Sequence, residues 1–213
     1  MKNSEKQIKV CGMREPANIA DLVELPINYI GTILYPKSPR YSGEREDTAQ
    51  AFRSLNSSVQ KVGVLVHPTL SFIEEMQEKF AFDYLQLHSD ESLDFCREAA
   101  KIAPIIKAFG IDTTTNFQTI ESYSTIADFF IFDTATKAYG GSGKKFDWTL
   151  LDNYHGEKPY LLAGGLTVDD AQSLTTITDP RCMGFDINSG FEISPALKDI
   201  SQIKEFVTTI HEQ

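Results

Sequence analysis

Residues 61–88 read KVGVLVHPTLSFIEEMQEKFAFDYLQLH, and this stretch alternates between two kinds of apolar pattern. The apolar, β-branched run over 61–66 predicts a strand, and the run over 83–88 predicts another. Between them, apolar residues recur every three or four positions over 69–80, which predicts a helix that Thr69 caps. The same alternation of strand and helix continues through the rest of the chain, so the sequence predicts an α/β fold.

Eight strands and eight helices follow from this periodicity. We expect the strands at residues 8–12, 29–35, 61–66, 83–88, 104–109, 128–133, 159–163 and 183–187. We expect the helices at residues 17–25, 46–56, 69–80, 91–102, 116–126, 147–153, 168–176 and 199–210. The helix at 147–153 is short and weakly amphipathic, and Asp90 and Asp147 are candidate caps.

Eight parallel strands could form either an open doubly wound sheet or a closed barrel. Eight regular strand–helix units in 213 residues, without an inserted block, favour a (β/α)8 TIM barrel. No linker rich in Ser, Gly or Pro divides the chain, and its composition does not shift along its length. We therefore expect residues 1–213 to form a single (β/α)8-barrel domain.

Charge and cysteine usage limit the partners and the compartment. Lys and Arg number 20 against 30 for Asp and Glu, which gives a net charge of −10 and a pI near 4.9. That balance repels phosphate backbones, so nucleic acids and anionic membrane surfaces are poor candidates for partners. Cys11, Cys96 and Cys182 form no CxxC pair, and residues 1–9 contain no apolar signal segment. We expect a cytoplasmic protein in which Cys96 and Cys182 are packing residues.

Polar and reactive residues end several of the predicted strands, where a TIM barrel places its chemistry. Cys11 closes the first strand before Gly12, so its thiol either reaches the barrel mouth or packs in the core. Asp133 follows the apolar run at 129–132, so its carboxyl either caps a turn or has its pKa shifted by loss of water. His88 ends the fourth strand without further metal ligands at a suitable spacing, which favours a hydrogen-bonded scaffold residue over a metal site.

Glycine-rich turns follow the last two predicted strands. Gly164 and Gly165 come after the seventh strand, and Ser189 and Gly190 come after the eighth, in the two loops that commonly hold a phosphate in this fold. Tight turns are the alternative, because turns use the same residues. Neither loop contains Lys or Arg, so backbone dipoles are expected to hold the anion.

The segment 140–144 reads GGSGK and could suggest a nucleotide-binding loop. It lacks the first glycine of a P-loop, and Lys145 stands where Ser or Thr would bind magnesium. A mobile active-site loop after the sixth strand is therefore the prediction for this segment.

Together these residues resemble the family of phosphoribosylanthranilate isomerases, enzymes of tryptophan biosynthesis, over nearly the whole chain. The resemblance is carried by nine blocks in order: IKVCG at 8–12, YPKSPRY at 35–41, QLH at 86–88, KAF at 107–109, DT at 133–134, GGSG at 140–143, FDW at 146–148, LAGGL at 162–166 and GFDINSGFE at 184–192. Ser89 stands where the family usually has Gly, and Asn188 replaces a Ser of the last block. These two departures concern the geometry of turns and the details of phosphate binding.

The resemblance implies an Amadori rearrangement of N-(5-phosphoribosyl)anthranilate to 1-(2-carboxyphenylamino)-1-deoxyribulose 5-phosphate, with no redox cofactor and no metal. By the family's assignment Asp133 is the general acid that protonates the furanose ring oxygen, and Cys11 is the general base that removes the C2 proton. A carboxyl beside an apolar wall can hold its proton to higher pH, and nearby donors can lower the pKa of a thiol at the mouth.

The resemblance also implies how a phosphorylated small molecule is bound. Arg40 offers a planar fork for the anthranilate carboxylate. Asp186 matches the family's second acidic residue, which contacts a sugar hydroxyl or the amine, and His88 is a further substrate-binding residue. The phosphate-binding residues are Gly164, Gly165, Ser189 and Gly190. A monomer and a homodimer both fit the sequence.

Two other functions fit parts of this pattern. The isomerase of the histidine pathway performs the same rearrangement with two aspartates, and Cys11 stands where that enzyme has an aspartate. A noncatalytic barrel that binds a phosphorylated ligand would keep the loops without turnover, whereas Cys11 and Asp133 are both present here. Both functions remain alternatives to the tryptophan-pathway isomerase.

Overall fold

The computed structural model describes residues 6–56, 58–135 and 145–212. Eight parallel strands close into a barrel in chain order, and β8 pairs with β1. The strands are β1 (Gln7–Val10), β2 (Tyr29–Ile33), β3 (Gln60–Leu65), β4 (Tyr84–Leu87), β5 (Ile105–Ile111), β6 (Phe129–Thr134), β7 (Tyr160–Leu162) and β8 (Cys182–Ile187). The TIM barrel expected from the sequence is confirmed.

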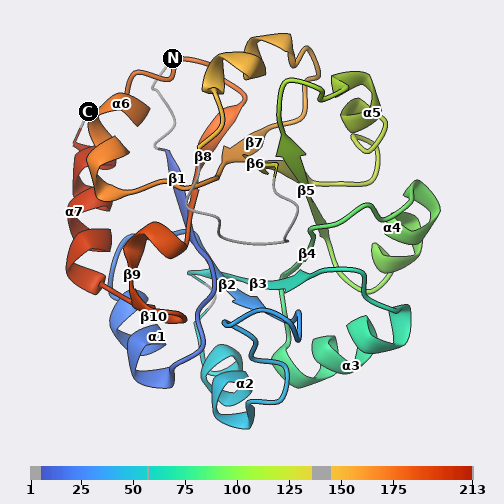
Figure 1. The fold of residues 1–213 in the computed structure, drawn as a ribbon. Helices are drawn as coiled ribbons and strands as arrows, with labels where there is room; N and C mark the ends of the chain where they lie inside the picture. Colours follow the sequence, from blue (N-terminus) through green and yellow to red (C-terminus); the bar gives the residue numbers. More distant parts are fainter. Residues whose placement is uncertain (1–5, 57, 136–144, 213) are drawn as a thin grey trace.

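Helices surround the ring of strands, as Figure 1 shows. The α-helices are α1 (Pro16–Leu22), α2 (Glu46–Arg53), α3 (Leu70–Phe80), α4 (Leu93–Ala99), α5 (Phe117–Glu121), α6 (Ala171–Leu174) and α7 (Ile200–His211). The 3-10 helices are η1 (Trp148–Asn153), η2 (Val168–Asp170) and η3 (Ser189–Phe191). An antiparallel hairpin, β9 (Glu192–Ser194) and β10 (Leu197–Lys198), lies between η3 and α7.

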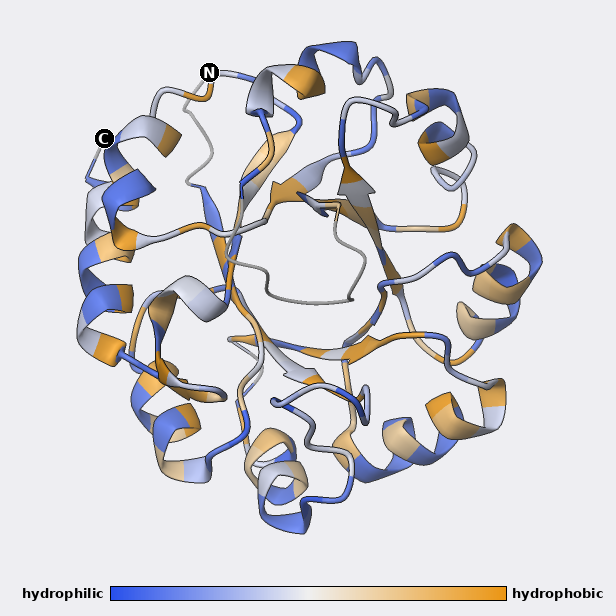
Figure 2. Ribbon diagram, viewed as in Figure 1, coloured by the Kyte–Doolittle hydropathy of each residue, from blue (hydrophilic) through white to orange (hydrophobic). Residues whose placement is uncertain are grey.

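The side chains of each strand alternate between two apolar cores, because successive residues of a strand point to opposite faces. Phe129 and Ile131 belong to the core inside the barrel, whereas Phe130 and Phe132 pack in the outer core between strands and helices. Figure 2 shows apolar residues on the helix faces that turn toward the barrel. The alternation therefore places Asp133, two residues after Ile131, on the inside.

The pairing register brings polar residues of neighbouring strands to the same level. Lys9 of β1 pairs with Asp186 of β8, one residue before Val10 and Ile187. Ile8 and Val10 belong to the outer core, so Lys9 faces the interior of the barrel. The register between β1 and β8 thus positions the two charged side chains opposite each other.

The expected elements differ from the observed ones mainly late in the chain. All eight expected strands are present, with ends that differ by at most two residues. The weakly amphipathic segment at 147–153 forms a 3-10 helix, and the expected helix at 168–176 divides into η2 and α6. The hairpin β9–β10 was not expected.

The helix caps are partly as predicted. Thr69 and Asp147 cap α3 and η1, each accepting a backbone N–H. The prediction of Asp90 as a cap is wrong, because α4 begins later and the hydroxyl of Ser92 accepts the N–H of Phe95 at 3.2 Å. A serine directly before the helix satisfies the free N–H without help from the earlier carboxylate.

Cys96 and Cys182 are buried packing residues, as expected. No helix in the described part of the chain is long and apolar enough to cross a membrane. The active-site loop expected at 140–144 lies outside the described residues.

Candidate active site

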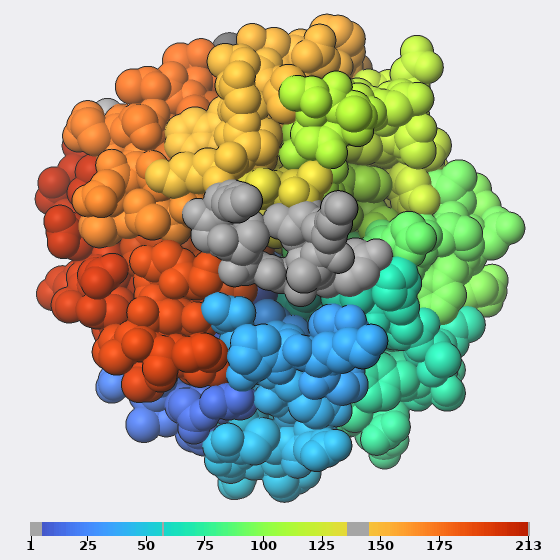
Figure 3. Space-filling view, in the orientation of Figure 1, coloured from blue at the N-terminus to red at the C-terminus, as the bar shows by residue number. Residues whose placement is uncertain are grey.

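A cavity of about 770 Å³ opens at the carboxyl end of the barrel strands. Figure 3 shows this face of the molecule, where the segment after β2 lies against the segment after β8. Every site residue predicted from the sequence lines this cavity, which is the position expected for the chemistry of a TIM barrel. These residues are Cys11, Arg40, His88, Asp133, Gly164, Gly165, Asp186, Ser189 and Gly190.

Lys9 and Asp186 form a buried ion pair next to Cys11. The Nζ atom of Lys9 lies 2.9 Å from each carboxylate oxygen of Asp186, and the Lys9 side chain is fully buried. A Cβ placed on Gly31 would lie 3.3 Å from Cys11 Sγ and 3.4 Å from Lys9 Nζ, so the thiol and the ammonium face the same small space. Burial works against the charge of Lys9, but Asp186 and Cys11 raise its pKa and keep it positive.

The thiol of Cys11 is almost completely buried. Burial raises its pKa, although the charges of Lys9 and Lys198 act in the opposite direction. The expectation that nearby donors lower the thiol pKa is therefore wrong, because loss of water outweighs the two ammonium groups. The thiol is a weaker acid here and its thiolate is a correspondingly stronger base.

Asp133 and His88 meet across the cavity. Burial raises the pKa of Asp133, against the N–H of Thr134 that donates to its Oδ1 at 2.7 Å. Burial and the charge of Lys107 lower the pKa of His88 to about 4, so its imidazole is neutral at pH 7. Asp133 Oδ2 lies 3.5 Å from His88 Nε2. The sequence expectation of a carboxyl that keeps its proton to higher pH is supported by this environment.

Gln86 lines the cavity on β4 and was not predicted as a site residue. Its Nε2 donates to His88 Nδ1 at 3.2 Å, which places the imidazole proton on Nε2 facing Asp133. The Oε1 atom of Gln86 is buried and accepts no hydrogen bond within the described part of the chain. Gln86 thus fixes the tautomer of His88 and has an acceptor left for a donor in the cavity.

Arg40 is held by a carboxylate of the protein. Its Nε and Nη2 donate to Oε1 and Oε2 of Glu192 at 2.8 and 2.6 Å. An incoming carboxylate therefore cannot use this edge of the guanidinium while Glu192 occupies it. The second edge, formed by Nη1 and the other hydrogen of Nη2, is able to bind a carboxylate through two hydrogen bonds.

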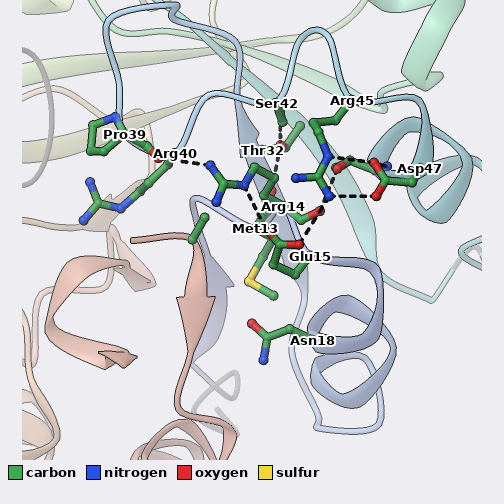
Figure 4. A network of polar contacts seen from close by, with 12 residues as sticks. Met13, Arg14, Glu15, Asn18, Thr32, Pro39, Arg40, Ser42, Arg45 and Asp47 are labelled. Atoms are coloured by element: carbon green, nitrogen blue, oxygen red, sulfur yellow. Dashed lines mark hydrogen bonds and ion pairs between the residues drawn. The ribbon is translucent and has the colours of Figure 1, made fainter. Parts of the chain in front are cut away.

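The segment that contains Arg40 is anchored to the loop after β1. The Nη1 atom of Arg14 donates to the carbonyl of Pro39 at 3.1 Å, and Thr32 Oγ1 donates to the carbonyl of Met13 at 2.7 Å. Figure 4 shows these contacts and the side chain of Arg40, which projects away from them. The backbone at Arg40 is thereby fixed, which leaves the guanidinium to be oriented by its own partners.

The two predicted phosphate loops lie next to each other. Gly164 and Gly165 have φ values of +95° and +64°, which residues with a side chain rarely adopt. A Cβ on Gly190 would lie 2.1 Å from the carbonyl oxygen of Leu166, so this glycine is needed where the loops touch. The backbone geometry therefore supports the tight-turn explanation for these glycines, and phosphate binding by the two loops stays a prediction.

A lysine from outside these loops lies behind them. Lys198 Nζ donates to Oδ1 of Asn188 at 2.7 Å, and Lys198 is buried. The sequence expectation counted only residues within the loops and so missed this cation. Asn188, where the family usually has Ser, thus links the predicted phosphate loop to Lys198.

Ser89, the other departure from the family pattern, fits its turn without strain. Its φ is not positive, so the turn does not require a glycine. The hydroxyl donates to Glu91 and accepts the backbone N–H of His67 at 2.8 Å. Lys107 Nζ donates to the carbonyl of Ser89 at 2.5 Å and secures the same turn.

Sequence reasoning therefore missed Lys9, Gln86, Glu192 and Lys198 as residues of the site. Lys9 carried a usable signal, because a lysine amid apolar residues of a barrel strand needs a buried partner. Glu192 lies in a quoted block but gave no sign that it reaches Arg40, 152 residues away. That contact exists only because β8 and β2 flank β1 in the closed barrel.

Known proteins share both the sequence and the fold. A family model described as N-(5'phosphoribosyl)anthranilate (PRA) isomerase matches residues 8–209. An N-(5'-phosphoribosyl)anthranilate isomerase of Parabacteroides distasonis is 45% identical over 204 residues, which are 95% of this chain and 92% of the relative.

Solved structures agree with this match. A phosphoribosyl anthranilate isomerase from Thermotoga maritima has a TM-score of 0.87 at 30% identity, covering 98% of this chain and 100% of that one. A structure of the enzyme in complex with reduced 1-(o-carboxyphenylamino)-1-deoxyribulose 5-phosphate has a TM-score of 0.83 at 27% identity, with the same coverage. The family model and these relatives span nearly the whole barrel, including the cavity, and the chain belongs to the N-(5'-phosphoribosyl)anthranilate isomerase family.

Proposed function

We propose that this chain isomerises N-(5-phosphoribosyl)anthranilate by an Amadori rearrangement in which Cys11 is the general base and Asp133 the general acid. The observation that carries the proposal is the placement of a buried thiol and a partly buried carboxyl in one cavity. Opening of the sugar ring needs a proton donor, and removal of the C2 proton needs a base. The product is 1-(2-carboxyphenylamino)-1-deoxyribulose 5-phosphate.

Asp133 acts first, as the acid. Its raised pKa keeps the carboxyl protonated at a higher pH than an exposed aspartate would allow. The proton passes to the furanose ring oxygen, the bond from C1 to that oxygen breaks, and the amine lone pair forms the C1=N bond of a Schiff base. The N–H of Thr134 stabilises the carboxylate that remains, and the neutral imidazole of His88 lies beside it with Nε2 at 3.5 Å from Oδ2.

Cys11 acts second, as the base. The thiolate takes the C2 proton, the C–H electron pair forms the C1=C2 bond of an enolamine, and the C=N electrons return to nitrogen. The enolamine then tautomerises to the ketone. The raised pKa makes the thiolate a strong base, and the buried ammonium of Lys9 next to it supplies the opposing charge that the thiolate needs.

Binding groups surround these two residues. Arg40 binds the anthranilate carboxylate through the guanidinium edge that Glu192 leaves free. The loops at 163–165 and 188–190 bind the phosphate, with Lys198 behind them. Asp186 is held by Lys9 and still has lone pairs that can accept a hydrogen bond from the sugar hydroxyl or the amine.

The setting of the reaction is part of the proposal. The enzyme binds a phosphorylated small molecule as its substrate, and the whole chain forms one catalytic domain. A net charge of −10 and three free cysteines, all buried, support an enzyme that works in the cytoplasm without nucleic acid or membrane partners.

One assay tests the activity and both roles. Freshly made phosphoribosylanthranilate is added, and the loss of its anthranilate fluorescence is followed. The wild-type protein should turn over, and Cys11→Ala and Asp133→Asn should each lower kcat by at least ~10². Cys182→Ala is the matched control, because its thiol is buried in the outer core and does not line the cavity. Turnover close to wild type in Cys11→Ala or Asp133→Asn would contradict the assignment.

A further inference from the structure

The hairpin β9–β10 brings a further carboxylate into contact with Arg40 of the cavity lining, and no step of the proposed reaction uses it. Glu192, at the start of the hairpin, binds the guanidinium of Arg40 through two hydrogen bonds of 2.8 and 2.6 Å. The two side chains are only 11% and 5% exposed, so little water reaches this pair. The geometry is the parallel, two-bond arrangement in which arginine and carboxylate are held most firmly.

Glu192 is itself fixed from two other directions. Its Oε1 accepts from Lys198 Nζ at 2.6 Å and from the backbone N–H of Ala196 at 3.1 Å. Ala196 has a φ of +69°, an unusual conformation for alanine, which turns its N–H toward the carboxylate. Burial alone would raise the pKa of Glu192, but its hydrogen bonds to Arg40 and Lys198 hold that pKa below the usual value.

Lys198 connects this cluster to the rest of the barrel. Its backbone N–H donates to Asn18 Oδ1 at 2.7 Å, and Asn18 Nδ2 donates back to the Lys198 carbonyl at 3.0 Å. Its ammonium also donates to Asn188, beside the predicted phosphate loop. One buried lysine therefore fixes both the carboxylate that holds Arg40 and a residue of the phosphate loop.

We propose that Glu192 is a positioning residue, which holds the guanidinium of Arg40 so that its free edge faces the cavity and selects substrates with a carboxylate. This inference rests on the proposed role of Arg40 as the carboxylate ligand. An arginine has several rotatable bonds, and fixing them before the substrate arrives lowers the entropic cost of binding. Because Lys198 joins the two ends of the site, the distance between the carboxylate and phosphate subsites is fixed as well.

The test compares two substrates in the intact enzyme. One is phosphoribosylanthranilate, and the other is the phosphoribosyl derivative of aniline, which lacks the carboxylate. Glu192→Gln keeps the size of the side chain but turns an amide N–H toward the guanidinium or the ammonium. We expect Glu192→Gln to raise KM for the carboxylated substrate by about tenfold, with little change in kcat. KM and kcat for the aniline substrate should stay unchanged.

Three controls complete the experiment. Glu205 lies on the exposed face of α7, so Glu205→Gln should leave KM unchanged for both substrates. Glu192→Asp keeps the negative charge, so its KM for the carboxylated substrate should rise less than that of Glu192→Gln. In an Arg40→Ala background, Glu192→Gln should add less than about twofold to KM, because Arg40 is the group through which it acts.

The outcomes separate the two assignments. If Arg40→Ala raises KM only for the carboxylated substrate and Glu192→Gln raises KM equally for both, Arg40 keeps its role and the positioning role of Glu192 is wrong. If Arg40→Ala raises KM by the same factor for both substrates, or for neither, the proposed carboxylate subsite is wrong and the inference falls with it. Should Glu192→Gln fail to fold, the same comparison with Glu192→Asp decides, and equal loss on both substrates overturns the proposal.

Discussion

The ammonium of Lys9 lies 2.9 Å from both carboxylate oxygens of Asp186, in the interior of the barrel and next to the thiol of Cys11. The pair forms because the register of β1 and β8 sets these residues opposite each other. Neither charge would be tolerated there alone, since an unpaired buried charge is strongly destabilising. The pair therefore serves stability and also places a positive charge beside the proposed base.

Removal of the ammonium should destabilise the protein in a pH-dependent way. Lys9→Met leaves a buried carboxyl without its partner, and we expect a loss of about 3 to 5 kcal/mol near neutral pH. Burial already raises the pKa of Asp186, and the variant raises it further. A carboxyl whose folded pKa lies above its unfolded value contributes stability at low pH and loses it as pH rises through the folded pKa.

Urea unfolding of Lys9→Met and wild type between pH 4 and 8 checks this prediction. The deficit of the variant should grow as pH rises. The double variant Lys9→Met with Asp186→Asn is the control, because it has no carboxyl at this position and its own unfolding free energy should lack the fall with pH that Lys9→Met shows. A constant deficit in Lys9→Met alone would show that the pair is not ionised.

The pH dependence of the rate should report the proton of Asp133. The reaction needs this carboxyl protonated, so kcat/KM of the wild type should fall at high pH. Asp133→Asn carries no proton that can be lost, so its low residual activity should rise with pH as Cys11 ionises and then stay level. His88 has a pKa of about 4 and does not titrate in this range. A falling limb that persists in Asp133→Asn would assign the proton to another group.

Loss of Arg40 should mainly weaken binding. A charge-assisted contact through two hydrogen bonds is worth about 2 to 3 kcal/mol, which should appear as a higher KM in Arg40→Ala with a smaller change in kcat. Arg45→Ala is the matched control, because Arg45 forms an exposed ion pair with Asp47 and does not line the cavity. An unchanged KM in Arg40→Ala would leave Arg40 a purely structural partner of Glu192.

The phosphate site is best tested at Ser189. Gly165→Val would also block the anion, but the φ of +64° means that valine would strain the backbone whatever the ligand does. Ser189→Ala keeps the backbone and should weaken inhibition by inorganic phosphate by the value of one hydrogen bond, about 1 kcal/mol or roughly fivefold. Ser54→Ala, on the surface after α2, is the control.

Crystals soaked in phosphate give an independent answer on this site. An anion between residues 163–165 and 188–190 is the expected result. An anion at another loop of the mouth, with these two segments empty, would show that the substrate is placed wrongly.

The barrel could be predicted from the sequence because its signals are local. Strand runs such as 61–66 and 128–133, separated by segments with helical periodicity, are sufficient for eight strand–helix units. The positions of Cys11 and Asp133 at strand ends follow from the same pattern. Local patterning thus predicted the fold and which residues stand at strand ends, but it left open whether Cys11 faces the cavity or the core.

The contacts that tune the site could not be predicted, because they join distant parts of the chain. The hairpin β9–β10 has strands of three and two residues, too short for a periodic pattern. The contact of Glu192 with Arg40 depends on this hairpin and on barrel closure. Burial raises the pKa of Cys11, and the charges of Lys9 and Lys198 lower it. Which effect is larger depends on the packing of the folded chain.

In the proposed reaction Asp133 opens the sugar ring and Cys11 then removes the C2 proton. The most direct measurement is the kinetic isotope effect on kcat/KM with substrate carrying deuterium at C2, in wild type, Cys11→Ala and Asp133→Asn. Cys11→Ala should enlarge the isotope effect, because proton removal becomes the slow step, whereas Asp133→Asn should bring it toward unity, because ring opening does. An enlarged effect in Asp133→Asn together with none in Cys11→Ala would contradict the assignment.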